Sequence, residues 1–476
     1  MKRVLSLILA VVMVLSLVAC GAKKEKSNKK PWEGLEGLHI GYGKAAYTPG
    51  EGTPMGGYGA PMSRLSTGQL SDLYLICLAI TDGEDVFLLY AMDACTMAKV
   101  WVTRARERVS KATGVPESQI IICSTHTHSA PDLGITPESE PSMKEAYDKS
   151  LAAAEKAAKS ALKDLAPATV YGATAQTEGM AFVRHFILSD GSVAGDNFGD
   201  WNRGLVTDYA MENDPQMVLA KFERKGAKDI LLMNFQVHPC LESGIDITTF
   251  SADVVGRVRD YMTEQTDMNV IYFTGSAGNQ NAVTKLMKDA HSMDSYAYAE
   301  KLGSYALACL ENMTPIEGND VKLTHYDYTG DVWQSNDPVQ IEHAKEVNKL
   351  FETEGREAAS PLARQYGFHS VYHANAIITH STMDPTRTME MKAFNIGGLG
   401  LVTAPYEMFS KQGTYIKTNS PFEFTVVCSM AGPHNGYIPA QEAYDYGCYE
   451  SQTAYFVSGT AEIVAEKYIE LLNSVK

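Results

Sequence analysis

Residues 119–131 read Gln-Ile-Ile-Ile-Cys-Ser-Thr-His-Thr-His-Ser-Ala-Pro. The uncharged run that opens this stretch is typical of a strand buried in a parallel sheet. It passes directly into His126 and His128. Because side chains two apart on a strand point to the same side, both imidazoles can face one cleft. Imidazole is a common zinc ligand, so the motif predicts a metal site at a strand end. A pair of hydrogen-bonded surface histidines is the alternative.

Short apolar runs alternate with longer amphipathic segments on both sides of this stretch. The apolar runs predict strands over residues 85–93, 119–124, 229–237, 268–274, 373–381, 399–403 and 424–429. Helical spacing predicts helices over residues 97–109, 142–164, 252–265, 292–311, 339–355 and 452–473. No internal repeat or shift in composition divides the chain. The pattern predicts an α/β fold, with mixed β-sheets and flanking helices, in a single large catalytic domain over residues 34–476.

Three further segments present polar side chains in similar surroundings. His238 follows an apolar strand and precedes Pro239, which cannot continue a sheet ladder. Glu407 also follows a strand and a proline, and Tyr437 lies in a loop fixed by glycine and proline. Strand ends are where α/β proteins usually bind their ligands. Each residue also has a plainer explanation: a structural histidine, a glutamate in the first turn of a helix, and a packing tyrosine.

The first residues carry a targeting signal. A short basic head precedes a continuous apolar run over residues 4–18, and small residues then lead into Cys20. This order predicts a lipoprotein signal peptide over residues 1–19, lipidation of Cys20 and a solvated, lipidated tether over residues 20–33. The expected location is extracytoplasmic, anchored by the lipid to a bacterial membrane. A plain signal peptide with a coincidental cysteine is the alternative.

The overall composition excludes some functions. The formal net charge is −16, which argues against nucleic acid as a partner. The eight cysteines form no CxxC pairs, so a structural zinc knot is not expected.

In their order along the chain, the conspicuous segments resemble the neutral/alkaline non-lysosomal ceramidase family over most of the mature chain. The matches are Thr48-Pro49, Met55-Gly-Gly-Tyr-Gly59, Ser66-Thr-Gly68, Thr125-His-Thr-His-Ser-Ala-Pro131, Asn234-Phe-Gln-Val-His-Pro239, Ala404-Pro-Tyr-Glu407, Asn435-Gly-Tyr-Ile-Pro439, Tyr444 and Gly447-Cys-Tyr-Glu450. The resemblance implies the fold of that family's amino-terminal catalytic domain. The additional β-rich carboxy-terminal domain of animal and bacterial members has no counterpart in this chain.

The resemblance also implies a metal site and its neighbours. One zinc ion would be held by His126, His238, Glu407 and Tyr437. Two imidazoles, a carboxylate and a phenolate form a nitrogen and oxygen set that suits zinc. By the same resemblance, His128 faces the substrate and Arg184 lies near the scissile group, where it can stabilise an oxyanion. An ordinary surface arginine is the alternative for Arg184.

The sequence departs from the family at two positions. The family's glycine-rich loop presents a serine credited with nucleophilic or proton-relay work, and alignment on Gly278 places Asn281 there. An amide is neither a nucleophile nor a general base, so Asn281 is expected to hydrogen-bond to the substrate. His434 stands where many relatives carry a tyrosine.

The expected function is hydrolysis of an amide or a related acyl bond by metal-activated water. The expected substrate is a small molecule or a lipid acyl-amide. A rival from another class is a non-catalytic, ligand-binding lipoprotein on the same fold, which the loss of the serine favours. A binuclear hydrolase is disfavoured because the chain lacks the HxHxDH pattern.

Overall fold

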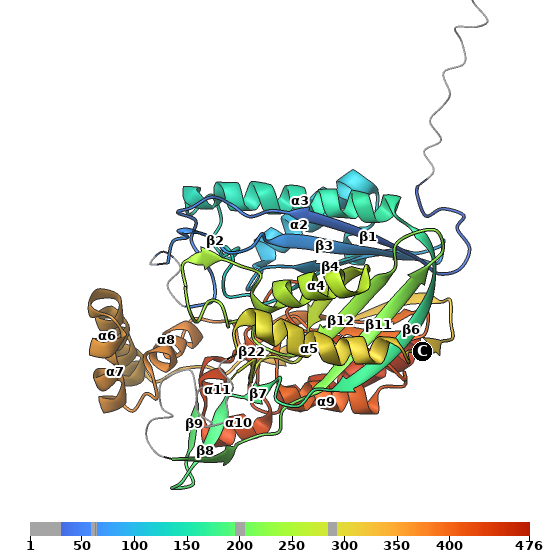
Figure 1. Ribbon diagram of the computed structural model, residues 1–476. Helices are drawn as coiled ribbons and strands as arrows, with labels where there is room; N and C mark the ends of the chain where they lie inside the picture. Colours follow the sequence, from blue (N-terminus) through green and yellow to red (C-terminus); the bar gives the residue numbers. More distant parts are fainter. Residues whose placement is uncertain (1–29, 59–61, 63, 196–204, 284–292) are drawn as a thin grey trace, which may run out of the picture.

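Two β-sheets lie face to face, and helices cover their outer faces (Figure 1). The computed structural model describes residues 30–58, 62, 64–195, 205–283 and 293–476. The predicted α/β fold, with mixed sheets and flanking helices in one domain, is confirmed. The predicted signal peptide, Cys20 and most of the predicted tether lie outside the described residues.

The larger sheet has nine strands and is mostly antiparallel. Its strands, in spatial order, are β14 (Asn269–Thr274), β12 (Ile230–Phe235), β11 (Gln216–Arg224), β6 (Ala166–Gln176), β1 (His39–Ala46), β3 (Tyr74–Thr81), β4 (Val86–Met92) and β5 (Ile120–Ser124), with β16 (Thr314–Ile316) also paired to β6. Only β4 with β5 and β12 with β14 pair in parallel.

The smaller main sheet has four strands, of which only β19 and β21 pair in parallel. In spatial order they are β17 (Val321–Asp331), β18 (Thr386–Ile396), β19 (Leu399–Thr403) and β21 (Thr425–Cys428). Short ladders join the surrounding loops: β10 (Val206–Tyr209), β8 (His185–Leu188) and β9 (Val193–Gly195); β2 (Gly68–Gln69) with β13 (Thr249–Phe250); β7 (Phe182–Val183) with β15 (Gln280–Asn281); and β20 (Glu407–Met408) with β22 (Tyr437–Ile438).

The helices lie outside the two sheets (Figure 1). They are α2 (Lys99–Thr113), α3 (Lys144–Lys163), α4 (Asp253–Thr266), α5 (Ser295–Leu310), α6 (Pro338–Glu354), α7 (Arg356–Gln365), α8 (Val371–His380), α9 (Ser410–Asn419), α10 (Gln441–Tyr446), α11 (Tyr449–Thr453) and α12 (Thr460–Val475). The helices α2 to α5 pack on the nine-stranded sheet, whereas α9 and α12 pack on the four-stranded one. Among the helices of the described ranges, none combines the length and the apolar character needed to cross a bilayer.

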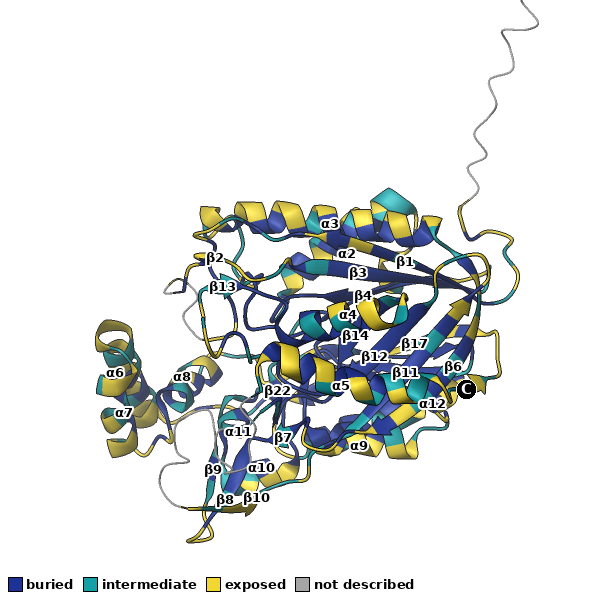
Figure 2. Cartoon of the chain, viewed as in Figure 1, coloured by how far each residue is buried: buried dark blue, intermediate teal, exposed yellow. Residues whose placement is uncertain are grey.

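Successive side chains along each strand point to opposite faces of the sheet, and those on the inner faces form the core between the two sheets. In β3, Ile76, Leu78 and Ile80 face the second sheet, whereas Leu75 and Cys77 face the helices. Both faces of the strand are therefore buried, and Figure 2 shows the strands dark between the exposed outer faces of the helices.

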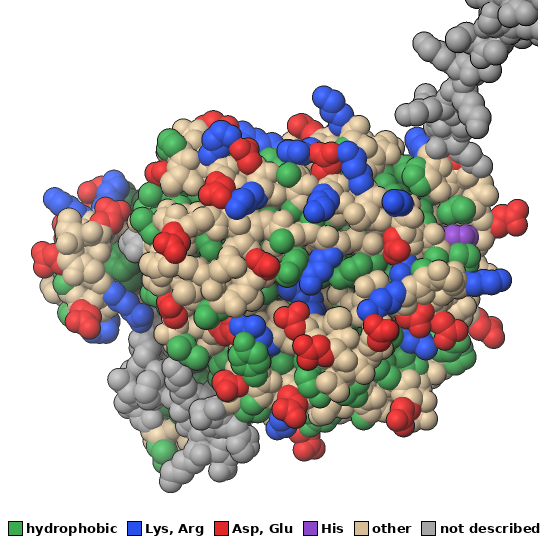
Figure 3. All heavy atoms as spheres, turned by 45° about the horizontal axis from the view of Figure 1, so that its top comes forward, with side chains coloured by type: hydrophobic (Ala, Val, Ile, Leu, Met, Phe, Trp, Pro, Cys, Tyr) green, Lys and Arg blue, Asp and Glu red, His purple; other side chains and the backbone are tan. Residues whose placement is uncertain are grey.

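Glycines let α3 approach β1 closely. A Cβ atom at Gly41 or Gly43 would lie 2.0 Å from a backbone carbonyl oxygen of α3. The helix presents small alanine side chains to the sheet. Its opposite face carries charges of both signs, which are interspersed on the surface shown in Figure 3. Such exposed pairs contribute little to stability.

The strand ends gather the predicted site residues. The strands β5, β12 and β19 belong to parallel pairs, and each is followed by one of the predicted ligand segments. The segment after β14 carries Gly278 and, in β15, Asn281, and the segment after β21 carries His434 and, in β22, Tyr437. The carboxyl ends of parallel strands meet at one edge, which is where α/β folds bind ligands.

Two predicted elements need correction. Residues 373–381 were expected to form a strand, but most of them lie in helix α8, where the side chain of Ser370 caps the first turn by accepting from the His373 backbone N–H. The helix expected over residues 452–473 is interrupted, because α11 ends at Thr453 and α12 begins only after Gly459, which has φ of 89°. The remaining predicted helices and strands are present, and all but the strand over residues 399–403 have shifted ends.

Candidate metal centre

Four of the sequence-predicted residues meet at one edge of the sheets. His126 follows β5 and His238 follows β12, while Glu407 and Tyr437 are direct partners in the parallel ladder of β20 and β22. Their exposed fractions are 3%, 2%, 5% and 9%, so all four are buried. The structure thus brings together side chains from segments that are far apart in the chain.

The donor atoms of three of these residues converge. The Nε2 atoms of His126 and His238 are 3.2 Å apart, and Glu407 Oε2 lies 3.2 Å from each of them. Glu407 Oε2 is buried and has no hydrogen-bond partner among the described residues. His126, His238 and Glu407 therefore form a group that can hold a metal ion.

Each imidazole is held through its other ring nitrogen. His126 Nδ1 lies 2.9 Å from the carbonyl oxygen of Cys95, and His238 Nδ1 lies 2.6 Å from that of Ala277. A carbonyl only accepts, so both Nδ1 atoms must donate, and in a neutral ring this leaves the Nε2 lone pair facing the group. Outer hydrogen bonds of this kind fix the tautomer and the orientation of metal-binding histidines.

The charges at the centre also suit a cation. Burial alone would raise the pKa of Glu407, but His126 and the other neighbouring rings hold it well below its ordinary value, so the carboxylate stays ionised. Burial lowers the pKa of His126, but Glu407 outweighs it and raises that pKa well above its ordinary value. Each group thus favours the charged form of the other, and a metal ion at the centre would compete with the proton on His126.

His126 and His128 meet for a different reason from the one predicted. The strand β5 ends at Ser124, and His126 has a φ of 68°, in the left-handed region. Its N–H donates to the carbonyl of Ala94 at 2.8 Å, which fixes this turn. The two Nε2 atoms are still 3.3 Å apart. A strained turn, rather than strand alternation, brings the imidazoles together.

His128 lies beside the group. Its ring is buried under Tyr58, with the two ring centroids 4.8 Å apart. Burial first, and then the neighbouring histidines, lower the pKa of His128 well below its ordinary value. Its Nδ1 has no hydrogen-bond partner within the described part of the chain. The ring is therefore a neutral imidazole with a nitrogen available for another group.

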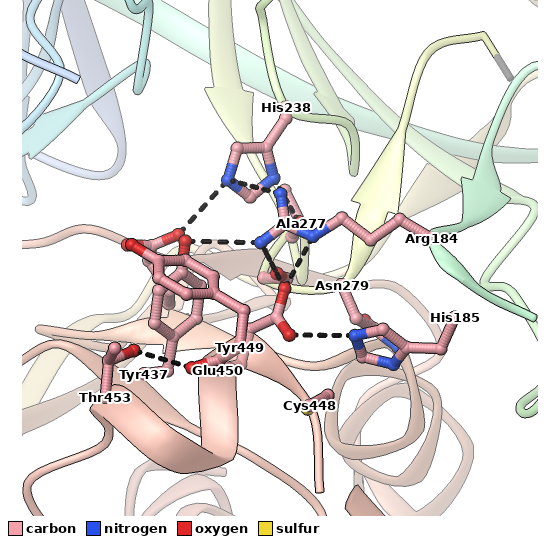
Figure 4. A network of polar contacts seen from close by, with 12 residues as sticks. Arg184, His185, His238, Ala277, Asn279, Tyr437, Cys448, Tyr449, Glu450 and Thr453 are labelled. Atoms are coloured by element: carbon pink, nitrogen blue, oxygen red, sulfur yellow. Dashed lines mark hydrogen bonds and ion pairs between the residues drawn. The ribbon is translucent and has the colours of Figure 1, made fainter. Parts of the chain in front are cut away.

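Arg184 is buried, so the alternative of an ordinary surface arginine is wrong. Its Nη2 atom donates to Tyr437 Oη at 3.2 Å, and its Nη1 atom lies 3.4 Å from His238 Nε2. Figure 4 shows the guanidinium between His238, Tyr437 and Glu450. Arg184 therefore places a positive charge beside the metal-binding group.

Tyr437 contacts this arginine, but without a metal ion its phenol stays protonated. Burial, followed by the charge of Glu407, raises the pKa of Tyr437 well above its ordinary value. Only a cation at the centre would make the phenolate favourable.

Asn281 lies beside His238 through the backbone. The two residues form an isolated parallel bridge, and the His238 N–H donates to the Gln280 carbonyl at 2.9 Å. Asn281 also pairs with Phe182 in the ladder that precedes Arg184. The position aligned with the family's serine is thus at the site, although it carries an amide.

Sequence reasoning gave no role to three residues in or near the centre, which are His434, Glu450 and His185. His434 Nε2 lies 3.4 Å from Glu407 Oε1, whereas the contacts to His126 and His238 are made by Oε2. Glu450 contacts both Arg184 and His185. The only sequence signals were the departure at His434 and the position of Glu450 in a matched motif.

Two solved structures share this architecture. The neutral ceramidase from Pseudomonas aeruginosa matches with a TM-score of 0.67 and 15% sequence identity, over 92% of this chain and 75% of that chain. A ceramidase complexed with C2 matches with a TM-score of 0.66 and 14% identity, over the same shares of the two chains. The fold is that of neutral ceramidase. No protein-family model and no curated protein sequence matches the chain. The ceramidase resemblance seen in the sequence is therefore confirmed at the level of the fold.

The pKa of His185, the residue next to Arg184, predicts that the stability of the protein depends on pH. Burial lowers its pKa, but Glu450 outweighs burial and raises the pKa from 6.5 to about 10. Between these values the native state binds one more proton than the unfolded chain. The stabilisation is therefore complete below the lower value and is lost as the pH rises through the upper one.

We expect the difference in unfolding free energy between the wild type and His185→Gln to shrink as the pH rises from 6.5 to about 10. The difference in unfolding free energy should fall by at most about 1.4 kcal/mol per pH unit. Urea unfolding across this range measures it. A difference that stays constant with pH would contradict the charged state of His185.

Proposed function

We propose that the protein is a zinc-dependent hydrolase that cleaves an amide or a related acyl bond. The observation that carries this proposal is the buried, unpartnered Oε2 of Glu407, 3.2 Å from the Nε2 atoms of His126 and His238. A buried carboxylate oxygen and two buried ring nitrogens, each 3.2 Å from the others, are arranged to share a cation. The ceramidase fold supports the choice of acyl-bond hydrolysis.

The spacing of the donors fits zinc. Zinc binds nitrogen and oxygen ligands at about 2.0–2.1 Å, so neighbouring corners of a zinc tetrahedron lie about 3.4 Å apart. The three distances among His126 Nε2, His238 Nε2 and Glu407 Oε2 are each 3.2 Å. Tyr437, the ladder partner of Glu407, is the proposed fourth ligand. When bound, zinc activates water and polarises the acyl carbonyl.

The surrounding residues of the chain support this chemistry. Arg184 directs Nη1 toward the centre, where its N–H groups can stabilise the negative charge that develops on the acyl oxygen. His128 has a buried, unpartnered Nδ1 that can hold a proton for the leaving group. We assign Asn281 a hydrogen-bonding role, because an amide cannot act as nucleophile or base.

The proposed substrate is a lipid or small-molecule acyl-amide outside the cytoplasmic membrane. The lipobox-like sequence at Cys20 supports the proposal of a lipid anchor, which would hold the enzyme near acyl lipids. The rival proposal is a ligand-binding lipoprotein, and the replacement of the family's serine by Asn281 is the observation that favours it.

Metal analysis combined with an assay separates these proposals. We expect purified protein to contain about one zinc ion per chain, as in other single-ion zinc hydrolases. A chelator should abolish turnover of an N-acyl amide panel, and added zinc should restore it. Stoichiometric zinc without turnover of any acyl substrate would favour the binding protein, and absence of zinc affinity would overturn the hydrolase.

A further inference from the structure

A buried carboxylate binds the guanidinium of Arg184 on the side away from the metal centre. Glu450 Oε1 accepts from Arg184 Nε at 2.6 Å and lies 2.5 Å from Nη2 (Figure 4). The carbonyl oxygen of Gly278 also accepts from Nη2, at 2.8 Å. The Glu450 side chain is 1% exposed, so water does not compete for this contact. The plane of the guanidinium is thereby fixed at two of its three nitrogens.

The third nitrogen is the one that faces the centre. Nη1 lies 3.4 Å from His238 Nε2, and the Gly278 loop and Tyr437 border the same guanidinium. A flexible arginine side chain loses rotamer freedom when it is held in this way, and that cost falls on folding rather than on substrate binding. The donor is then already in place when charge develops on the substrate.

The second oxygen of Glu450 is occupied as well. His185 Nε2 lies 2.8 Å from Oε2, and the hydroxyl of Tyr446 lies 2.9 Å from His185 Nδ1. Each oxygen of the carboxylate thus holds one cation, so Glu450 cannot rotate without breaking a buried contact. His185, Glu450 and Cys448 also form a second buried group of His, Cys and Glu side chains, in which His185 and Glu450 contact each other directly.

We infer that Glu450, braced by His185, is a positioning residue that holds Arg184 Nη1 toward the scissile acyl group. The inference rests on the proposed function for the reaction that Arg184 assists, whereas the contact between Glu450 and Arg184 does not depend on that function. It also gives a role to the Gly447-Cys-Tyr-Glu450 segment. Glu450 does not touch the reacting atoms and acts only through Arg184.

The choice of variant follows from the charges. Glu450→Gln alone would leave two buried cations without a counterion and can prevent folding. The double variant Glu450→Gln/His185→Gln removes one charge of each sign, so the net charge of the network is unchanged. Asp164→Asn is a control away from the centre, because it removes the carboxylate charge that faces the buried Arg224, although the Asp164 side chain is 39% exposed.

Three measurements test the inference. In the double variant we expect kcat to fall about 100-fold with little change in KM, since misplacement of a catalytic donor by about 1 Å costs this much. Acetate, titrated into cobalt-substituted protein and followed by visible absorption, should bind about tenfold more weakly. A crystal structure of the double variant should show Nη1 displaced from His238. Asp164→Asn should change none of these.

A mutant cycle decides whether Glu450 acts through Arg184. When both substitutions are added to Arg184→Met, we expect no further fall in kcat, because the residue that they position is already absent. A further fall of the same size would overturn the inference, as would an unmoved guanidinium in the double variant. If the wild type hydrolyses no acyl substrate, the proposed function fails, and the position of the guanidinium still decides the role of Glu450.

Discussion

Glu407→Gln is expected to lower the affinity for zinc by more than about 100-fold and to abolish amide hydrolysis, because loss of a ligand costs more than loss of an outer hydrogen bond. Glutamine keeps the shape of the side chain but removes the charge that balances the cation. Its amide also presents either a weaker oxygen or an N–H group to the two ligand imidazoles.

Competition with a chromophoric chelator measures the zinc affinity, and turnover of the amide panel measures the activity. Glu423→Gln makes the same chemical change at an exposed position and should alter neither quantity. Wild-type zinc affinity in Glu407→Gln would show that the cation does not bind at this group, and would remove the basis of the hydrolase proposal.

The ligands could be predicted because each follows a recognisable local pattern. His126, His238 and Glu407 come within a few residues of the ends of apolar strands, and strand ends of parallel pairs meet at one edge. Their separate patterns were weak, and only their order along the chain connected them to one fold. The convergence of their donor atoms is a tertiary fact that no single segment contains.

Other features had no local signal. The positive φ of His126 depends on the carbonyl of Ala94 in a neighbouring segment. The contact between Glu450 and Arg184 joins residues that are 266 positions apart. Such long-range contacts depend on how the two sheets pack, which the sequence pattern does not determine.

The errors in secondary structure have physical causes as well. The apolar residues of α8 form a short run that suits a buried helix and a buried strand equally, and periodicity alone does not separate the two. The strand β17 went unpredicted because only two of its residues are buried and its middle carries the exposed His325, Tyr326 and Asp327. Its pairing with β18, rather than its own composition, holds it extended.

The second large effect is expected from Arg259→Met, which should destabilise the protein by about 3–5 kcal/mol. Arg259 of α4 donates through Nη1 and Nη2 to the two oxygens of Asp93, at 2.8 and 2.6 Å. Asp93 is fully buried directly after β4, and it also accepts from the Tyr74 N–H at 2.9 Å. Methionine keeps much of the volume of arginine but leaves the Asp93 carboxylate buried without its counterion.

The loss is large because native proteins are stable by only about 5–15 kcal/mol, so it takes a substantial share of the total. It should also reach the metal centre, because the residue after Asp93 supplies the carbonyl that holds the strained turn of His126. Urea unfolding measures the change in the free energy of unfolding.

Two further variants serve as controls. Arg104→Met, which removes an exposed pair with Glu138, should lower the free energy of unfolding by no more than about 1 kcal/mol. The double variant Asp93→Asn/Arg259→Met should be more stable than Arg259→Met alone, because the unpaired charge is gone while the amide oxygen can still accept from Tyr74. If the double variant were less stable than the single one, lost packing rather than a buried charge would explain the effect.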